Sequence, residues 1–101
     1  MKTILFVGLN DKITGLQEIP TAAARDLIAN ICFENSDGVT ISECTGIYRH
    51  KDGRKIIEKS FRLEFYGLSQ DSENKIIELL KTGLNQESIA VEKINSDLIF
   101  A

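Results

Sequence analysis

The sequence predicts an α+β domain whose elements follow the order strand, helix, strand, strand, helix, strand. Three features predict it: an apolar run near the start, two long alternating segments around an Asp-Gly turn, and two stretches with apolar residues at helical spacing. The chain has 101 residues, of which 43% are hydrophobic and 27% charged. That size and composition are typical of one globular domain, so we assign residues 1–101 to a single domain.

The first strand is expected at residues 3–9, a continuous apolar run typical of a strand covered on both faces. A loop over residues 10–20 follows, and it is long for a strand-to-helix connection. Thr21 has a side chain suited to cap a helix that begins there. The helix is indicated by an apolar stripe that ends before the turn-forming residues 35–38 and consists of Ala24, Leu27, Ile28 and Ile31.

Residues 37–66 predict one long β-hairpin whose register follows from the positions of its apolar residues. A two-residue Asp52-Gly53 loop would place the apolar residues of the two strands on opposite faces. A three-residue loop that begins at Lys51, with Gly53 in the left-handed conformation, places them on one face and is therefore preferred. The resulting pairs are Val39 with Phe65, Ile41 with Leu63 and Ile47 with Ile57 on the apolar face, and Tyr48 with Ile56 on the other face.

Two charged residues fall on the apolar face of this hairpin. The register places Glu43 opposite Phe61. It places Lys59 opposite Thr45, so Lys59 is a diagonal neighbour of Glu43 and within its reach. One interpretation is a half-buried ion pair where the covering helices end, with both side chains extending toward water. The other interpretation is a polar site in a groove beside the core.

A second helix and a last strand complete the pattern. Ser69 or Asp71 is placed to cap the helix, and Gly83 fits its C-terminal end. Residues 87–94 alternate as a strand, and a short apolar tail follows at residues 97–101. The inner face of the helix is expected to comprise Ile76, Ile77, Leu80 and Leu84.

Six elements in this order predict the ferredoxin-like split β-α-β fold, an antiparallel sheet with two helices on one face. Right-handed crossovers place the first strand in the middle of the sheet. One side-chain set of that strand then lies on the helix-free face, either Ile4 and Phe6 or the alternate set Leu5, Val7 and Leu9. Tyr48 and Ile56 fall on the same face of the hairpin.

An apolar centre on an open sheet face predicts contact with a partner, most simply a second copy of the chain. The apolar tail at residues 98–100 would extend that contact. The alternative is a twisted sheet that buries its own edge. We favour a homo-oligomer.

The sequence contains no catalytic constellation, metal-ligand cluster or cofactor motif. His50 is the only histidine and lies beside the hairpin turn, which is typical of a solvated residue. Cys32 and Cys44 are isolated, and their spacing matches no metal or redox motif, so we expect two reduced thiols. We therefore predict no catalytic residues, no metal ligands and no cofactor, and a non-enzymatic role is favoured.

Composition also limits the partners and the compartment. A net charge of −3 without a stripe of lysine and arginine argues against nucleic-acid binding. The start of the chain is too short and too strand-like for a signal peptide. No apolar run approaches the ~18 residues that span a membrane. We expect a cytoplasmic protein without a membrane segment.

Two functional hypotheses from different classes remain. The first is a non-catalytic interaction module that binds or inhibits another macromolecule through a surface containing Tyr48, Ile56 and Arg62. The second is a small-molecule or anion binder, or a simple enzyme, with a pocket between the loop at residues 10–20 and the sheet. The polar groups of that pocket would come from Asn10, Glu43 and Lys59.

The first two-thirds of the chain resembles a bacterial family of small proteins with an uncharacterised domain. The similarity is carried by FVGL near the start, then DGVTISECTGIYRHKDGR, then EKSFRLEF. Family members show a phenylalanine-glycine strand, a proline-aspartate-glycine-leucine-threonine turn and a glutamate-x-serine strand. The matching positions are Phe6, Gly8, Asp37, Gly38, Thr40, Gly46, Tyr48, Gly53, Glu58 and Ser60.

The chain departs from the family pattern at two places. Asn35-Ser36 stand in place of the proline-containing turn, and Tyr48 replaces a tryptophan. The family has no established activity, so the resemblance implies the fold and leaves the function open. Short chains of this kind also occur in phages and mobile elements, where many inhibit host defence, and we include such an inhibitor within the first hypothesis.

Overall fold

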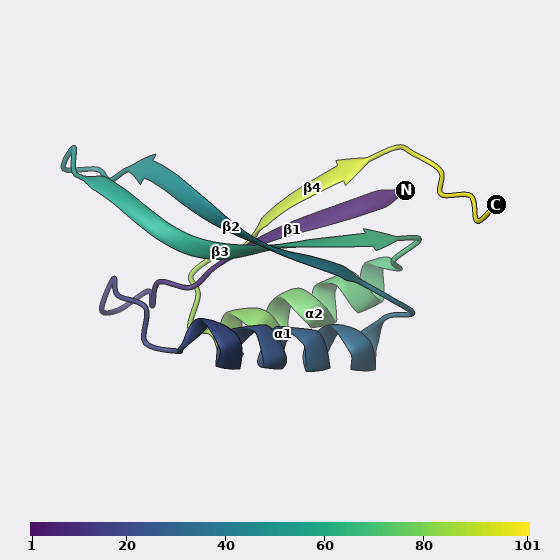
Figure 1. Ribbon diagram of the computed structural model, residues 1–101, viewed down its shortest axis with the longest axis horizontal. Coiled ribbons are helices and arrows are strands. Elements are labelled where there is room, and N and C mark those ends of the chain that lie inside the picture. Colours follow the sequence, from purple (N-terminus) through teal and green to yellow (C-terminus); the bar gives the residue numbers. More distant parts are fainter.

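The computed structural model describes residues 1–101 as two layers, a four-stranded antiparallel sheet with two helices on one face (Figure 1). This arrangement confirms the predicted α+β, ferredoxin-like order of elements. In chain order the elements are β1 (Lys2–Gly8), α1 (Thr21–Asn35), β2 (Thr40–Arg49), β3 (Lys55–Tyr66), α2 (Gln70–Gly83) and β4 (Ala90–Ile94).

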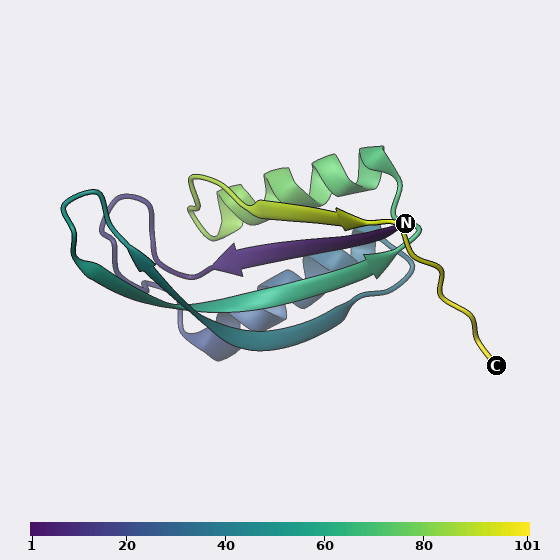
Figure 2. The same cartoon turned by 90° about the horizontal axis from the view of Figure 1, so that it is seen from above.

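The strand order in the sheet is β2-β3-β1-β4, so β1 lies between β3 and β4 as predicted. Viewed from above, the two helices run beneath the sheet, and the opposite face carries no helix (Figure 2). No helix of the chain is long and apolar enough to cross a membrane.

The hairpin has the register that the apolar pattern predicted. Ile47 pairs with Ile57, and Tyr48 pairs with Ile56. At the turn, the His50 N–H donates to the Arg54 carbonyl over 2.8 Å, which closes a three-residue loop. Gly53 has φ +90°, a conformation that glycine adopts without steric cost.

The core lies between the sheet and the helices. Strand residues alternate between the two faces of the sheet. One alternate set of side chains from β1 and from the C-terminal half of β3 therefore packs against the inner faces of α1 and α2. The buried apolar cluster consists of Leu5, Val7, Leu9, Ala24, Ile28, Cys32, Phe61, Leu63, Phe65, Ile76, Leu80 and Leu84.

The open face of the sheet carries Ile4 and Phe6 from β1, one of the two sets considered from the sequence. Ile4 is 0% exposed and Phe6 39% exposed. Ile4 lies beside Glu64. Glu64 Oε1 forms ion pairs with Lys2 Nζ at 2.9 Å and with Arg62 Nη2 at 3.0 Å. Long charged side chains cover apolar surface with their aliphatic stems, so the open face buries part of its own apolar centre.

The distal half of the hairpin projects beyond the helical layer (Figure 1). We call residues 43–59 of this projection the hairpin arm. Because no helix covers the arm, the paired Ile47 and Ile57 remain 64% and 60% exposed. Glu43 and Lys59 are exposed too, and no ion pair joins them. The half-buried ion pair considered from the sequence is therefore absent, because the helices end before this part of the hairpin.

The ends of the helices and of the last strand differ in detail from the expectations. Thr21 is the first residue of α1 rather than its cap, and its hydroxyl accepts a hydrogen bond from Gln17 Nε2 at 3.0 Å. Ser69 caps α2, accepting from the Ser72 N–H at 3.1 Å. The final strand begins at Ala90 rather than residue 87, because the preceding residues form a loop against the segment after β1.

Candidate functional site

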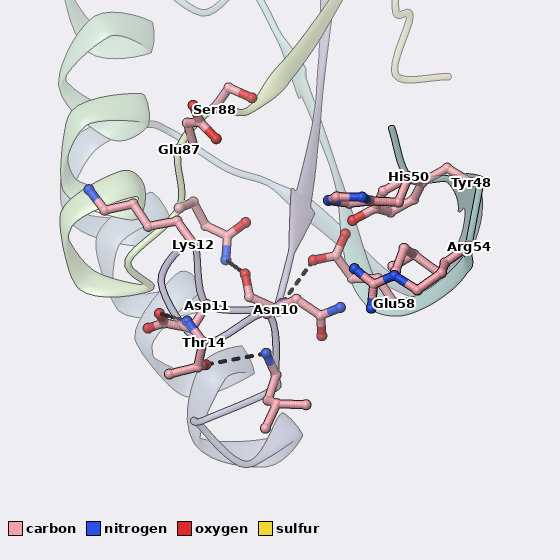
Figure 3. A pocket seen from close by; sticks show the side chains of 14 residues that line it. Asn10, Asp11, Lys12, Thr14, Tyr48, His50, Arg54, Glu58, Glu87 and Ser88 are labelled. Atoms are coloured by element: carbon pink, nitrogen blue, oxygen red, sulfur yellow. Dashed lines mark hydrogen bonds between the residues drawn. The ribbon is translucent and has the colours of Figure 1, made fainter. Parts of the chain in front are cut away.

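A cleft of about 500 Å³ lies between the loop that follows β1, the hairpin arm, and the segment that joins α2 to β4 (Figure 3). Ligand sites commonly have volumes of about 300–1,000 Å³, so the cleft is large enough for a small molecule. Its lining residues are Asn10, Asp11, Lys12, Thr14, Gly15, Leu16, Tyr48, His50, Arg54, Ile56, Glu58, Gln86, Glu87 and Ser88.

Glu58 is the best-positioned carboxylate of this cleft. It comes from β3 and accepts a hydrogen bond from the Asn10 backbone N–H, with 2.8 Å between N and Oε2. Gly8 leaves room for it, because a Cβ at Gly8 would come within 2.5 Å of all three carboxyl atoms of Glu58. Figure 3 shows the Glu58 side chain directed from the arm toward Asn10. The carboxylate is thus held in one place at the floor of the cleft.

The loop wall is ordered by Asp11. Asp11 Oδ1 accepts from the N–H groups of Ile13 at 2.8 Å and Thr14 at 3.2 Å, which forms a tight turn. Asp11 Oδ2 accepts from Asn85 Nδ2 at 2.8 Å, which ties the loop to the segment after α2. These hydrogen bonds, that from Asn85 above all, lower the pKa of Asp11 below its ordinary value.

The arm contributes the opposite wall. Tyr48, His50 and Arg54 face the loop across Glu58 (Figure 3). Asp52 at the hairpin turn steadies this wall by accepting from Arg54 Nε at 2.6 Å, and it lies 3.3 Å from His50 Nδ1. The pKa of Asp52 is lowered chiefly by its hydrogen bonds from the Arg54 backbone and guanidinium.

The cleft is polar and carries both signs of charge. Asp11, Glu58 and Glu87 supply carboxylates, while Lys12 and Arg54 supply cations. Most ligand sites are lined mainly by apolar groups, so this lining suits a charged and strongly hydrogen-bonding ligand. No group of three or more His, Cys, Asp or Glu side chains is arranged to hold a metal ion.

The structure brings some of the sequence-predicted residues together and separates others. Asn10, Tyr48 and Ile56 all line the cleft, which lies where the second hypothesis placed a pocket. Glu43 and Lys59 point to the helix-side face of the arm and do not line it.

Arg62 also lies outside the cleft. It is on the open face of the sheet, where it pairs with Glu64. The interaction surface expected from the sequence is therefore divided between the wall of the cleft, which holds Tyr48 and Ile56, and the charged part of the open face.

Three residues of the cleft, Glu58, Gln86 and Glu87, are not among the site residues expected from the sequence. Glu58 is the glutamate of the glutamate-x-serine strand in the family resemblance, but that pattern implies a fold and no site. The feature that distinguishes Glu58 from the other strand carboxylates is the neighbouring Gly8, which leaves space for its side chain. This relationship can be recognised only once the pairing of β1 with β3 is known. Gln86 and Glu87 reach the cleft because the segment after α2 folds against the loop at residues 10–12.

No protein-family model matches the chain, and no curated protein matches it in sequence. Solved structures do resemble it in fold. A phage SAM lyase in complex with S-methyl-5'-thioadenosine has a TM-score of 0.57 and 24% identity, covering 89% of this chain and 76% of that chain. The same lyase in its apo state has a TM-score of 0.57 and 23% identity, with 89% and 75% coverage.

The periplasmic divalent cation tolerance protein CutA from Archaeoglobus fulgidus has a TM-score of 0.61 and 12% identity, covering 97% of this chain and 88% of that chain. The phage lyase and CutA thus share one architecture with this chain across most of its length. At these identities the likeness establishes the fold of the chain, a small α+β domain with an antiparallel sheet.

Proposed function

We propose that the chain binds S-adenosylmethionine in the cleft and cleaves it, releasing S-methyl-5'-thioadenosine. The observation that carries the proposal is the fixed carboxylate of Glu58 at the floor of a polar cleft. The fold likeness to a phage SAM lyase that holds S-methyl-5'-thioadenosine supports the choice of ligand. Such a ligand corresponds to the small-molecule alternative expected from the sequence, with its pocket between the loop at residues 10–20 and the sheet.

The charges of the cleft match those of the ligand. S-adenosylmethionine carries a sulfonium and an ammonium cation, a carboxylate and a ribose diol. Carboxylates are the usual acceptors for ribose hydroxyls and attract cations, and Glu58 and Glu87 offer both interactions. Arg54 offers a partner for the ligand carboxylate, and the ring of Tyr48, on the same wall, offers a surface for the adenine.

The proposed reaction needs no second substrate. A carboxylate oxygen of the methionine part attacks its own Cγ, the Cγ–S bond breaks, and the electron pair of that bond passes to sulfur. The sulfonium becomes the neutral thioether of S-methyl-5'-thioadenosine, and the four-carbon fragment leaves as a lactone.

Holding the attacking oxygen in line with the breaking bond is the main contribution that such a site makes to the rate. We assign this positioning to Arg54, and we assign Glu58 to holding the nucleoside.

The direct test is to incubate the purified protein with S-adenosylmethionine and to follow S-methyl-5'-thioadenosine by liquid chromatography and mass spectrometry. We expect steady release from the wild type, and a loss of at least about tenfold in Glu58→Gln, since one hydrogen bond to a charged group is worth ~1.5–3 kcal/mol. Glu78→Gln, an exposed carboxylate on α2, is the matched control and should retain full activity. Absence of both product and a ligand-dependent rise in melting temperature would contradict the proposal.

A second candidate is the interaction module of the first hypothesis, including self-association and inhibition of a macromolecule. It is favoured by the hairpin arm, which exposes the apolar pair Ile47 and Ile57 on one face. On its other face the arm presents Tyr48 beside Ile56. Exposed apolar residues grouped on a projecting hairpin are typical of an interface.

Native mass spectrometry tests this second candidate. A subunit count above one that falls to one in Ile47→Lys, with Lys59→Glu as an exposed control on the same face of the arm, would support it. A monomeric wild type would rule out self-association. A retained adduct with the mass of S-methyl-5'-thioadenosine would instead support the first proposal in the same spectrum.

A further inference from the structure

Asn10 is held at both of its backbone polar groups. Its N–H donates to Glu58, and its carbonyl accepts from Gln86 Nε2 at 2.7 Å. The two bonds come from opposite sides of the cleft, one from β3 and one from the segment after α2 (Figure 3). The orientation of the Asn10 backbone therefore depends on Gln86 as well as on Glu58.

The buried side-chain amide of Gln86 donates its hydrogen bonds to backbone carbonyl groups. Gln86 is 8% exposed, and its Nε2 also lies 3.3 Å from the Leu84 carbonyl. Burying an amide is unfavourable unless its hydrogen bonds are made, and an apolar side chain would fill this place without that requirement. The polar character of residue 86 is thus explained by the carbonyl groups that it contacts.

Asn85 brings Gln86 into this position. It has φ +49°, a left-handed conformation that asparagine tolerates better than most residues. Its side chain donates to Asp11, and its carbonyl accepts from the Lys12 N–H at 3.0 Å. The segment at residues 85–86 and the loop at residues 10–12 are consequently joined by three hydrogen bonds.

We propose that Gln86 is a positioning residue for the cleft: by holding the Asn10 carbonyl, it keeps the Asn10 N–H directed at the Glu58 carboxylate. It does not contact the ligand in this role. The same segment carries Glu87 at the edge of the cleft, so Gln86 also ties the backbone beside Glu87 to the loop after β1. The consequence for turnover rests on the proposed function, whereas the consequence for the Asn10 backbone does not.

Amide hydrogen exchange of the ligand-free protein, followed by NMR, tests the structural part. Gln86→Met removes the donor and keeps a similar volume. We expect exchange at the Asn10 N–H to rise roughly tenfold, the equivalent of losing one hydrogen bond. Gln70→Met is the matched control, because Gln70 is an exposed glutamine at the start of α2 whose bonds lie within that helix and to Lys93. Unchanged protection of Asn10 in Gln86→Met would overturn the proposal.

Gln86→Glu provides a second variant with a reversible readout. A carboxylate cannot donate to the Asn10 carbonyl, whereas a protonated carboxyl can. Protection of the Asn10 N–H, corrected for intrinsic exchange, should therefore be lost at pH 7 and return as the pH falls through the titration of residue 86. Equal protection at both pH values would contradict the proposed contact. The wild type measured at the same pH values controls for the other carboxyls of the cleft, Asp11, Glu58 and Glu87. Protection of a core amide such as that of Leu63 must stay constant in Gln86→Glu, because a buried carboxylate that destabilised the whole fold would expose both amides together.

Measurements of turnover distinguish a failure of the positioning role of Gln86 from a failure of the proposed function. If the wild type releases S-methyl-5'-thioadenosine, Gln86→Met should lower kcat about tenfold or more at a temperature well below its melting point. Full activity with an exposed Asn10 amide would overturn the positioning role. If the wild type releases no product, the proposed function fails, and the exchange experiment still decides whether Gln86 positions Asn10.

Discussion

The carboxylate of Glu58 occupies the space that a side chain at Gly8 would fill. The two residues lie on neighbouring antiparallel strands, where Gly8 pairs with Ser60, two residues from Glu58 and on the same face. The missing side chain lets Glu58 fold over β1 and reach the Asn10 N–H. A glycine that would otherwise weaken a central strand thus determines where a charged group of the cleft lies.

Gly8→Ala should displace the Glu58 carboxylate without disrupting the fold. The flexible end of the glutamate can move, so we expect a stability loss of only about 1 kcal/mol, from the hydrogen bond to Asn10. Misplacement of a positioned group by about 1 Å can cost ~100-fold in rate, so turnover should fall far more than stability. Urea unfolding and product release measure the two effects. Equal turnover in Gly8→Ala and wild type would show that the position of Glu58 is unimportant.

Asp11 should make the protein less stable in acid. Its pKa is lowered in the folded state, so the stabilisation that it contributes is complete above the ordinary value of 3.8. That contribution is lost as the pH falls from there through the lowered folded-state pKa. Melting temperatures of the wild type and Asp11→Asn, compared from pH 7 to pH 2, should differ most at neutral pH and converge at the acid end. A difference that grows with acidity would contradict this assignment.

The two helix starts should respond differently to the loss of a hydroxyl. Ser69→Ala removes the cap that accepts the Ser72 N–H and should cost about 1 kcal/mol. Thr21→Ala removes no capping hydrogen bond, since Thr21 only accepts from Gln17, and should cost less. Urea unfolding of the pair measures the contrast. A larger loss for Thr21→Ala would restore the capping role that the sequence suggested.

The two cysteines should differ in reactivity. Cys32 is buried in the core, and burial raises its pKa to about 12, so almost none of it is thiolate at neutral pH. Cys44 lies on the helix-free face, half-buried, with its Sγ 3.2 Å from Ser60 Oγ. Iodoacetamide followed by peptide mass analysis should modify Cys44 first in the native protein and both residues in urea. Rapid native labelling of Cys32 would indicate that the core opens readily.

The sequence was sufficient to predict the order of elements and the hairpin register. Both follow from local periodicity, because a one-residue slip between the strands would have placed Ile41 and Ile47 on the face opposite to Leu63. The central place of β1 followed from the order of the elements, because crossover connections between parallel strands are right-handed. The loop after β1 was also identified as a place for a site, because of its length and its end at a helix.

The tertiary structure decided which polar residues meet. Glu43 and Lys59 share a face with apolar neighbours in the sequence pattern, yet they stand in solvent, because helix length and placement determine where the core ends. No local pattern assigns a site role to Glu58 or Gln86, since their roles depend on groups 48 and 76 residues away along the chain. Periodicity records which side of an element is buried, whereas a site depends on contacts between distant segments, and only folding brings those contacts together.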